Sequence, residues 1–463
     1  MYKKIISICS LATLFLGSTT TLAASIEAPS SNQTNWSDRW QNADWMSRLK
    51  DDTLLSNLSI PGTHDTAADD VSELAKTQSL SIPKQLENGI RFLDVRVRAI
   101  NGVFAVHHGE YYLNMMFGDV LNETIAFLSK HPDETVYMRL KQEKSSESNA
   151  VFNKIFQEKY VKNYSSWFYY SSESGDNPPI SATRGKIVIM RNFKEDTSGV
   201  GIPYISDSTD IQDNYEASTY WEKTQSVNAQ LNNSNSHYND GKTYINYVSY
   251  WDWDDTNWGR AQHMNNETML EMRRKVIKHA GIVVADYPGD QLINRTIDMN
   301  QKNLKNPATY YDNSLVIIRA GQDPDHRVLD SNLTGFQALI YNDNGGLNQK
   351  WVLKYIPEKD AYTIEALFSS MGGKSLVATV SDKVAVNDAF STIIPEYKPI
   401  ADGEYWKIQQ SPYYGFYGNE CKLVNVGNGK NLDIYNNSLK PYGYLITYPN
   451  NDQGNQNFQI NQD

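Results

Sequence analysis

Short apolar runs of strand length recur between residues 55 and 290, and longer amphipathic segments separate them. The runs are NLSIPGTH, GIRFLDVRV, GVFAVHHG, ETVYMRLK, GKIVIMR, TYINYVSY and GIVVADYPG. Segments such as GDVLNETIAFLSKH, NAVFNKIFQEKYV and NETMLEMRRKVIKHA repeat apolar residues every three or four positions, which is typical of helices. Alternating strands and helices predict an α/β fold with a parallel sheet, and the number of units fits a (β/α) barrel.

The pattern changes after residue 295. Residues 296–312 are polar, Asn-rich and aperiodic, and we interpret them as a linker. Residues 313–463 contain short strands separated by Gly and Asn turns, which predicts a separate all-β domain. A weak repeat places Trp351, Trp406 and Phe458 at intervals of 55 and 52 residues, as three similar β units require.

The first residues have the pattern of a secretory signal peptide. Two lysines precede an apolar stretch at 5–16, and small residues follow at Ala23 and Ala24. We therefore expect residues 1–24 to be removed, a catalytic domain to occupy 25–295, and the protein to be secreted. Cys9 lies in the signal, so Cys421 would remain alone and no disulfide would form within the mature chain.

Composition narrows the choice of partners. The formal net charge of −11 argues against binding to nucleic acid. Aromatic residues make up 12% of the chain, with 30 Tyr and 10 Trp, which fits exported proteins that bind sugars or interfaces without deciding between them.

Chemically active side chains follow the predicted strands. Pro61 and Gly62 predict a turn after the first apolar run, and His64 and Asp65 come directly after this pair. In a barrel the chemistry lies at the carboxyl ends of the strands. The residues at or just after those ends are His64, Arg96, His108, Lys141, Arg191 and Asp286.

The segments SIPGTHDT, GIRFLDVRVR, VHHG, MRLKQE, RGKIVIMR, IQDNY and VVADY occur in the order found in bacterial phosphatidylinositol-specific phospholipases C. The chain resembles that family over residues 40–295. The resemblance implies an irregular TIM-type barrel and metal-independent cleavage of phosphatidylinositol in membranes. In that reaction the inositol 2-hydroxyl attacks phosphorus, and diacylglycerol and inositol 1,2-cyclic phosphate are released.

The resemblance also assigns roles to residues. His64 is the general base, His108 the general acid, and Arg96 binds the non-bridging phosphate oxygens. Asp286 belongs with His64, and Asp65 lies on the side of the acid. His107 precedes His108 on one strand, so only one of the two can face the interior, and the family match selects the second.

Headgroup contacts follow from the same resemblance. The residues that match inositol contacts are Lys141, Arg191, Asp213 and Tyr215. The Arg191 match is the weakest, because an ungapped alignment places the family's arginine at Asn192. Asp94 shares a strand face with Arg96, and it acts either on the substrate or as a salt-bridge partner of that arginine.

No metal or other cofactor is expected, because Arg96 stands where metal-dependent relatives carry a carboxylate, although Asp65, Asp94, Glu143 and Asp286 in principle offer oxygen ligands. Two alternatives stay open. One is a metal-dependent phosphodiesterase acting on another phospholipid, and the other is an inactive lectin-like or toxin-like binding protein. Whether glycosyl-phosphatidylinositol anchors are also cleaved is open, and we expect a monomer.

Two further regions have binding potential. The segment WDWDDTNWG, with Trp251, Trp253 and Trp258, is a membrane-contact candidate whose acidic residues oppose binding to anionic lipid. The C-terminal domain resembles a ricin-type β-trefoil, a fold that usually binds sugars. Its third unit carries the best candidate sugar site, made of Asp433, Tyr448, Asn455 and Gln456.

Overall fold

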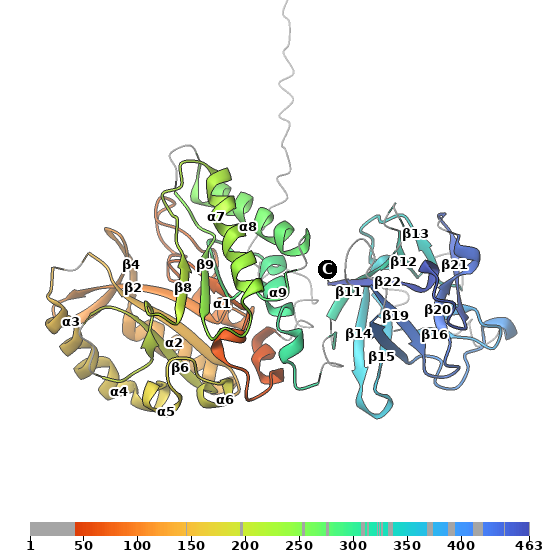
Figure 1. Cartoon of the computed structure of the whole chain (residues 1–463), viewed down its shortest axis with the longest axis horizontal. Helices are drawn as coiled ribbons and strands as arrows, with labels where there is room; N and C mark the ends of the chain where they lie inside the picture. Colours follow the sequence, from red (N-terminus) through yellow and green to blue (C-terminus); the bar gives the residue numbers. More distant parts are fainter. Residues whose placement is uncertain are drawn as a thin grey trace, which may run out of the picture.

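The computed structural model shows an α/β body followed by an all-β body (Figure 1). It describes residues 42–462 except 145, 195–197, 252–254, 275–276, 307–310, 313, 322, 324, 326, 332–336, 368–373, 388–393, 411–419 and 439. The predicted signal peptide, residues 1–24, lies outside the described residues. Among the helices described, none has both the length and the apolar character needed to cross a membrane.

A parallel sheet forms the centre of the first body. Its strands lie in the order β7-β6-β5-β2-β1-β10-β9-β8, and every neighbouring pair is parallel. The bounds are β1 Ile60–Thr63, β2 Phe92–Ile100, β5 Thr135–Gln142, β6 Lys186–Asn192, β7 Ile202–Pro203, β8 Thr209–Gln212, β9 Thr243–Tyr247 and β10 Ile282–Ala285. In the described residues β7 and β8 do not pair with each other, so the sheet is a curled, open half-barrel rather than a closed one.

An antiparallel hairpin extends this sheet beside the second strand. β3 (Val103–His108) pairs with β2, and β4 (Tyr111–Met116) pairs with β3. The hairpin brings His108 back toward the carboxyl edge of the parallel strands.

The first strand differs from the sequence prediction. Pro61 and Gly62 lie inside β1, in register with Val283 and Val284 of β10, and the turn begins only at His64. Gly62 is needed in the strand because a Cβ atom there would lie 2.9 Å from the Phe92 side chain. The predicted Pro-Gly turn is therefore wrong, although His64 and Asp65 do follow the strand end.

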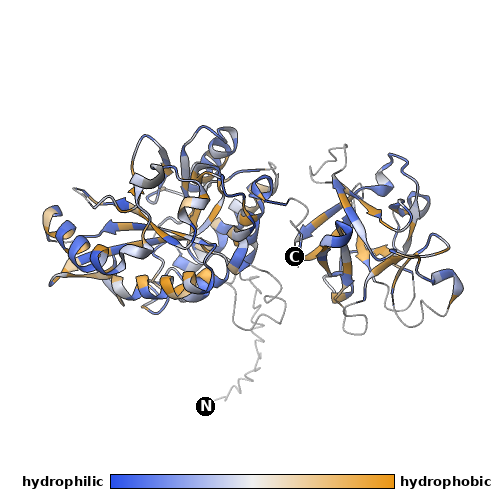
Figure 2. Ribbon diagram, turned by 90° about the horizontal axis from the view of Figure 1, so that it is seen from below, coloured by the Kyte–Doolittle hydropathy of each residue, from blue (hydrophilic) through white to orange (hydrophobic). Residues whose placement is uncertain are grey.

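Helices and short helical turns pack around the sheet (Figure 1). Their bounds are η2 Asn42–Arg48, η3 Leu55–Asn57, α1 Ile82–Glu87, α2 Phe117–Lys130, α3 Asn149–Ile155, the π-helix η4 Phe156–Val161, α4 Lys162–Tyr164, η5 Ser165–Trp167, α5 Ser171–Ser174, α6 Ile180–Thr183, α7 Tyr220–Ser236, α8 Asn257–Arg274 and α9 Asp290–Asp298. Hydrophobic residues concentrate on the strands and on the inner sides of the helices (Figure 2). This burial on both faces explains the continuous apolar runs of β6 and β10.

The segment interpreted as a linker is partly structured. α9 and the 3₁₀ turn η6 (Gln301–Asn303) occupy its first half, and Leu304 bridges Leu49. The side chain of Asn300 accepts from the amide of Ser59 and donates to the Ser59 carbonyl, at 2.9 and 2.7 Å. The sequence of residues 296–304 looks polar and aperiodic because its buried asparagines hydrogen-bond to backbone groups. The linker prediction is therefore wrong for these residues.

The second body contains a ring of six antiparallel strands and three hairpins. The ring order is β11-β14-β15-β18-β19-β22, and β22 closes it by pairing with β11. The ring strands are β11 Ser314–Ala320, β14 Trp351–Ile356, β15 Ala361–Ala366, β18 Trp406–Gln410, β19 Glu420–Asn425 and β22 Phe458–Gln462. The hairpins are β12 Val328–Asp330 with β13 Leu339–Tyr341, β16 Leu376–Ala378 with β17 Val384–Val386, and β20 Asn431–Ile434 with β21 Gly443–Tyr448.

The repeated aromatic residues lie in the core of this second body. Trp351, Trp406 and Phe458 are fully buried. The indole of Trp351 donates to the carbonyl of Leu329 at 3.1 Å, and that of Trp406 donates to Leu376 at 2.8 Å. The two tryptophans therefore connect the ring to its hairpins in equivalent ways, as a repeated unit requires.

Candidate active site

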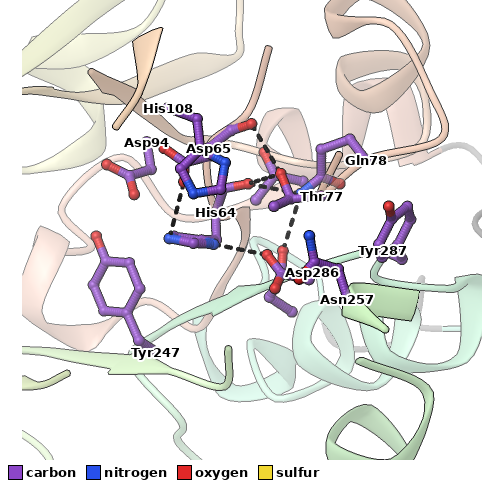
Figure 3. A network of polar contacts seen from close by, with 12 residues as sticks. His64, Asp65, Thr77, Gln78, Asp94, His108, Tyr247, Asn257, Asp286 and Tyr287 are labelled. Carbon is purple, nitrogen blue, oxygen red and sulfur yellow. Dashed lines mark hydrogen bonds and ion pairs between the residues drawn. The ribbon is translucent and has the colours of Figure 1, made fainter. Parts of the chain in front are cut away.

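Polar side chains converge at the carboxyl edge of the half-barrel (Figure 3). His64 and Asp65 follow β1, Asp286 follows β10, and Arg96 projects from β2. His108 ends β3. Parallel strands end on one edge of the sheet, which explains why residues distant in sequence meet here.

His64 lies between two carboxylates. Its Nδ1 is 2.7 Å from Oδ1 of Asp286, and its Nε2 is 3.3 Å from Oδ2 of Asp65. Burial lowers the pKa of His64, but Asp65 and Asp286 together raise it by more, so the net shift is upward. The imidazolium form is therefore stabilised, which makes this ring a candidate proton acceptor.

His108 approaches the same aspartate from the other side. Its Nε2 is 3.3 Å from Oδ2 of Asp65, and its Nδ1 donates to the carbonyl of Ala75 at 2.9 Å. The two imidazole centroids are 6.2 Å apart. The carbonyl of Ala75 therefore fixes the tautomer of His108, and Asp65 lies on the side of this ring, as the resemblance implies. His107 is buried beside Tyr112 on the other face of the strand.

Arg96 lies between Asp65 and Asp94. Its Nε is 3.1 Å from Oδ1 of Asp65, and its Nη2 donates to Oδ2 of Asp94 at 2.9 Å. Burial raises the pKa of the Asp94 carboxyl, but Arg96 and Arg139 outweigh this effect and hold that pKa well below its usual range. Asp94 is therefore ionised, and it is a salt-bridge partner of Arg96, one of the two roles left open by the sequence.

Of the two predicted headgroup residues on β5 and β6, one lies near this centre and the other faces elsewhere. Lys141 is in register with Arg96, and its Nζ is 3.0 Å from Oε2 of Glu143. Arg191 is in register with Leu140, so it lies on the opposite face of the sheet and donates to the carbonyl of Val200. The prediction that Arg191 contacts the headgroup is therefore wrong, because strand alternation turns this residue away from the interior.

Asn192 is the inward residue at that place on β6. Its Oδ1 accepts from Nε and Nη2 of Arg139 at 2.9 and 2.7 Å. A guanidinium therefore does lie beside position 192, but it comes from the neighbouring strand. The segment MRLKQE contained the signal, since Arg139 precedes Lys141 by two residues and so shares its face.

Asp213 and Tyr215 follow β8 at the same edge. The amide of Tyr215 donates to the carbonyl of Asp213, and 55% of the Tyr215 residue is exposed. The Tyr215 ring is therefore accessible to a ligand at this edge, as its predicted contact with inositol requires.

Sequence reasoning missed Lys223, a fully buried residue of α7. Its Nζ donates to Oε1 of Gln212 at 3.2 Å. Burial lowers the pKa of Lys223 to about 8, although Asp213 and Asp286 act in the opposite direction. α7 has few apolar residues, so its sequence gave no periodic signal that one lysine points inward.

Some site atoms have the geometry of a metal-ligand set. His64, Asp65 and Asp94 each offer one atom, and these atoms lie within 4.8 Å of one another. The guanidinium of Arg96, however, contacts both aspartates. A divalent cation among these ligands would be repelled by that fixed positive charge.

The candidate membrane loop is only partly described. Trp253, Asp252 and Asp254 lie outside the described residues. Trp251 is 46% exposed, whereas the ring of Trp258 packs edge-on against Tyr287 at 5.0 Å.

Three of the four candidate sugar residues meet at the third hairpin of the all-β body, where Asp433 of β20 faces Asn455 and Gln456 of the 3₁₀ turn η12 (Gly454–Gln456). Oδ1 of Asp433 accepts from Asn455 at 2.9 Å, and its Oδ2 accepts from Gln456 at 2.8 Å. Asp433 is 2% exposed, whereas Tyr448 is 51% exposed. Asp330 of the first hairpin also accepts from an Asn-Gln pair, since its Oδ2 contacts Asn348 and Gln349 at 2.7 and 3.0 Å, which relates the two units.

A curled parallel sheet with two imidazoles and a guanidinium at its carboxyl edge has the side chains expected of an α/β enzyme that acts on a phosphate ester. Residues 52–193 match the family described as "Phosphatidylinositol-specific phospholipase C, X domain". The chain belongs to the bacterial phosphatidylinositol-specific phospholipase C family.

Relatives and a solved structure cover the first body. A "1-phosphatidylinositol phosphodiesterase" of Staphylococcus aureus is 30% identical over 295 residues, which are 56% of this chain and 94% of that protein. The one of Listeria monocytogenes is 30% identical over 292 residues, covering 58% and 90%. The structure of the Listeria phosphatidylinositol-specific phospholipase C matches with a TM-score of 0.51 and 29% identity, over 56% of this chain and 99% of that one.

Proposed function

We propose that this chain is a phosphatidylinositol-specific phospholipase C that cleaves its substrate by internal attack. The observation that carries the proposal is the pair of histidines 6.2 Å apart on either side of Asp65, with Arg96 bound to the same aspartate. An internal hydroxyl needs a base, an alkoxide leaving group needs an acid, and the phosphate needs fixed positive charge. These residues supply all three.

The proton transfers balance across the two histidines. His64 accepts the proton of the inositol 2-hydroxyl as its oxygen forms the new bond to phosphorus. Arg96 stabilises the charge on the non-bridging oxygens, and His108 donates a proton to the glycerol oxygen as its bond to phosphorus breaks. Diacylglycerol leaves and inositol 1,2-cyclic phosphate remains, which a water molecule then hydrolyses with the two histidines in reversed roles.

Asp286 and Asp65 support these transfers. The contact between Asp286 and His64 orients the imidazole and stabilises its charged form after proton transfer. Asp65 contacts both histidines and Arg96, so it connects the base, the acid and the phosphate-binding group. Lys141, Asp213 and Tyr215 are the proposed inositol contacts, with charged groups for the hydroxyls and the tyrosine ring as a stacking surface.

The reaction is proposed to need no metal, since Arg96 supplies the positive charge. The test is phosphorus NMR of phosphatidylinositol and phosphatidylcholine vesicles treated with purified protein in excess chelator. A five-membered cyclic phosphate signal from phosphatidylinositol alone supports the proposal. Product only with added calcium would favour a metal-dependent phosphodiesterase, and no product in either condition would leave a binding protein on a catalytic scaffold.

For the second body we propose a β-trefoil that binds carbohydrate. Support comes from the six-stranded ring with three hairpins, and from the equivalent Asp-Gln contacts of the first and third units. Asp433 would receive sugar hydroxyls beside the exposed ring of Tyr448. Tyr397 serves as a control, because its ring packs under Nζ of Lys383 at 4.8 Å and is no part of the candidate site. Glycan-array binding of the full chain should fall in Tyr448→Ala and persist in Tyr397→Ala, and equal binding by both variants would contradict the site.

We also propose that the protein is secreted as a monomer after loss of residues 1–24. N-terminal sequencing and the molar mass of protein from the culture medium test both points. An intact amino terminus retained in the cell pellet would contradict export. Release of a glycosyl-phosphatidylinositol-anchored marker from cells tests whether anchors are substrates as well.

A further inference from the structure

Two guanidinium groups share the carboxylate of Asp94. Oδ2 of Asp94 accepts from Nη2 of Arg96 at 2.9 Å, and Oδ1 accepts from Nη1 of Arg139 at 3.2 Å. Asp94 is 1% exposed and is in register with Arg139 on the neighbouring strand. Each oxygen of a buried carboxylate is thus engaged by a different arginine.

Arg139 is fixed from several elements. Nη1 donates to the hydroxyl of Tyr247 at 2.8 Å, and Nε and Nη2 donate to Asn192. The guanidinium carbon lies 4.4 Å from the ring centroid of Tyr204, whose hydroxyl donates to that of Tyr247 at 3.0 Å. A planar guanidinium held by β2, β6, β9 and a stacked ring has a single orientation.

This arrangement limits how Arg96 can bind Asp94. A free carboxylate and an arginine prefer a two-oxygen, fork-to-fork contact. Here Oδ1 of Asp94 is already occupied by Arg139, so Arg96 contacts only Oδ2. In the described part of the chain no residue engages Nη1 of Arg96, so this group is available to a ligand.

We propose that Arg139 is a positioning residue of the catalytic site. By occupying one oxygen of Asp94, it keeps Arg96 from a two-oxygen contact and directs the free Nη1 group toward a non-bridging phosphate oxygen. The inference rests on the proposed function, because it concerns the residue that binds the phosphate. Arg139 itself does not touch the substrate in this account.

The test compares Arg139→Met with Arg139→Lys, using Arg184→Met as a matched control. Arg184 is paired with Asp51 at the opposite end of the strands, so its loss removes a partly buried guanidinium without touching the site. Phosphorothioate analogues of phosphatidylinositol distinguish the two non-bridging oxygens, because sulfur replaces one oxygen or the other. An enzyme that binds one of them through Arg96 prefers one diastereomer.

In Arg139→Met we expect kcat to fall on the order of 10- to 100-fold with little change in KM, because the phosphate contact is displaced rather than removed. The preference for one phosphorothioate diastereomer should fall as well. Arg139→Lys should recover part of kcat and part of the diastereomer preference, since a lysine keeps the positive charge beside Asp94 but lacks the planar guanidinium. Arg184→Met should lower thermal stability and leave the preference unchanged.

A substrate-free measurement separates this inference from the proposed function. The Nε–H of Arg96 donates to Oδ2 of Asp94 at 3.2 Å, and the same nitrogen lies 3.1 Å from Oδ1 of Asp65. The NMR signal of this proton and its protection from solvent exchange report that geometry. We expect the signal to shift or lose protection in Arg139→Met and to stay unchanged in Arg184→Met. Wild-type protein that gives no cyclic phosphate would overturn the proposed function alone, whereas an unchanged Arg96 signal in Arg139→Met would overturn the positioning role.

Discussion

His64 has a pKa that depends on two carboxylates of different character. Asp286 accepts from His64 at 2.7 Å and, among the described residues, is not shared with His108 or Arg96, whereas Asp65 contacts His64, His108 and Arg96. A general base acts only when it is neutral, so activity should rise as pH passes the pKa of His64. Because that pKa is raised above 6.5, the acidic limb of the wild-type profile should lie above this value.

Asp286→Asn tests this relation. Removing the charge should lower the pKa of His64 and move the acidic limb of kcat/KM to lower pH. At the same time kcat should fall by about 10²-fold, because the imidazolium formed in the reaction loses its stabilising partner. A pH profile of both enzymes from pH 5 to 9 measures the two effects, and a limb that stays in place would contradict the assigned pair.

His108 and its neighbour offer a second residue-scale test. His108→Ala should slow cleavage of phosphatidylinositol by about 10²- to 10⁴-fold, since the alkoxide leaving group loses its acid. An inositol phosphodiester with a 4-nitrophenol leaving group should be affected much less, because nitrophenolate leaves without protonation. His107→Ala is the control, and equal sensitivity of both substrates in His108→Ala would contradict its role as the acid.

At the scale of elements, α7 contains a buried lysine that lowers the free energy of unfolding at neutral pH. Lys223 has a pKa of about 8 in the folded protein, against an ordinary value of 10.5. Above pH 10.5 the amine is neutral in both the folded and unfolded states. As pH falls from 10.5 to 8, the unfolded state binds a proton that the folded state does not, so the free energy of unfolding decreases and then levels off below pH 8.

Lys223→Met should therefore raise the free energy of unfolding at pH 7, by about 2 kcal/mol after the lost hydrogen bond to Gln212 is counted. The gain should shrink between pH 8 and 10.5. Urea unfolding across that range measures it, with the exposed Lys84→Met as the control. A gain that does not change with pH would contradict the depressed pKa.

The elements also show where sequence patterns are sufficient. Periodicity predicted a helix over residues 118–131 and the structure has α2 at Phe117–Lys130, because its buried face is apolar. The polar α7 was missed, and α8 begins at Asn257, nine residues before the amphipathic stretch at 266–280. Apolar spacing identifies helices that bury a hydrophobic stripe, but not those whose inward residues are Lys, Gln or Ser.

The same limit explains which site residues were found. His64, Arg96, His108 and Asp286 follow predicted strand ends, and the structure brings them together. The prediction for Arg191 was wrong because neighbouring residues of a strand point to opposite faces, so a one-residue error in the alignment selects the wrong face. The sequence alone did not decide between positions 191 and 192. Arg139 shares the face of Lys141, yet its partners Tyr204 and Tyr247 come from distant segments that only folding brings near.

At the scale of the whole molecule, charge and exposed aromatic residues act in opposite directions. The formal net charge is −11, so an anionic bilayer repels the protein at long range. Exposed apolar side chains occur in the segments that follow the carboxyl ends of the strands. Leu74, Tyr215 and Trp251 lie on loops, and Trp221 lies in the first turn of α7. Such side chains bind the interface through apolar burial, which salt does not weaken.

We therefore expect vesicle binding and hydrolysis to increase with salt when phosphatidylinositol is diluted in anionic phosphatidylglycerol. At about 0.01 M salt the screening length is about 30 Å and repulsion reaches the whole molecule, whereas at about 0.15 M it falls to about 8 Å. With phosphatidylcholine as diluent the same change should have a much smaller effect. Sedimentation of sucrose-loaded vesicles and initial rates measure both arms, and Leu74→Ala should weaken binding to each kind of vesicle. Binding to anionic vesicles that decreases with salt would instead indicate a local basic surface that outweighs the net charge.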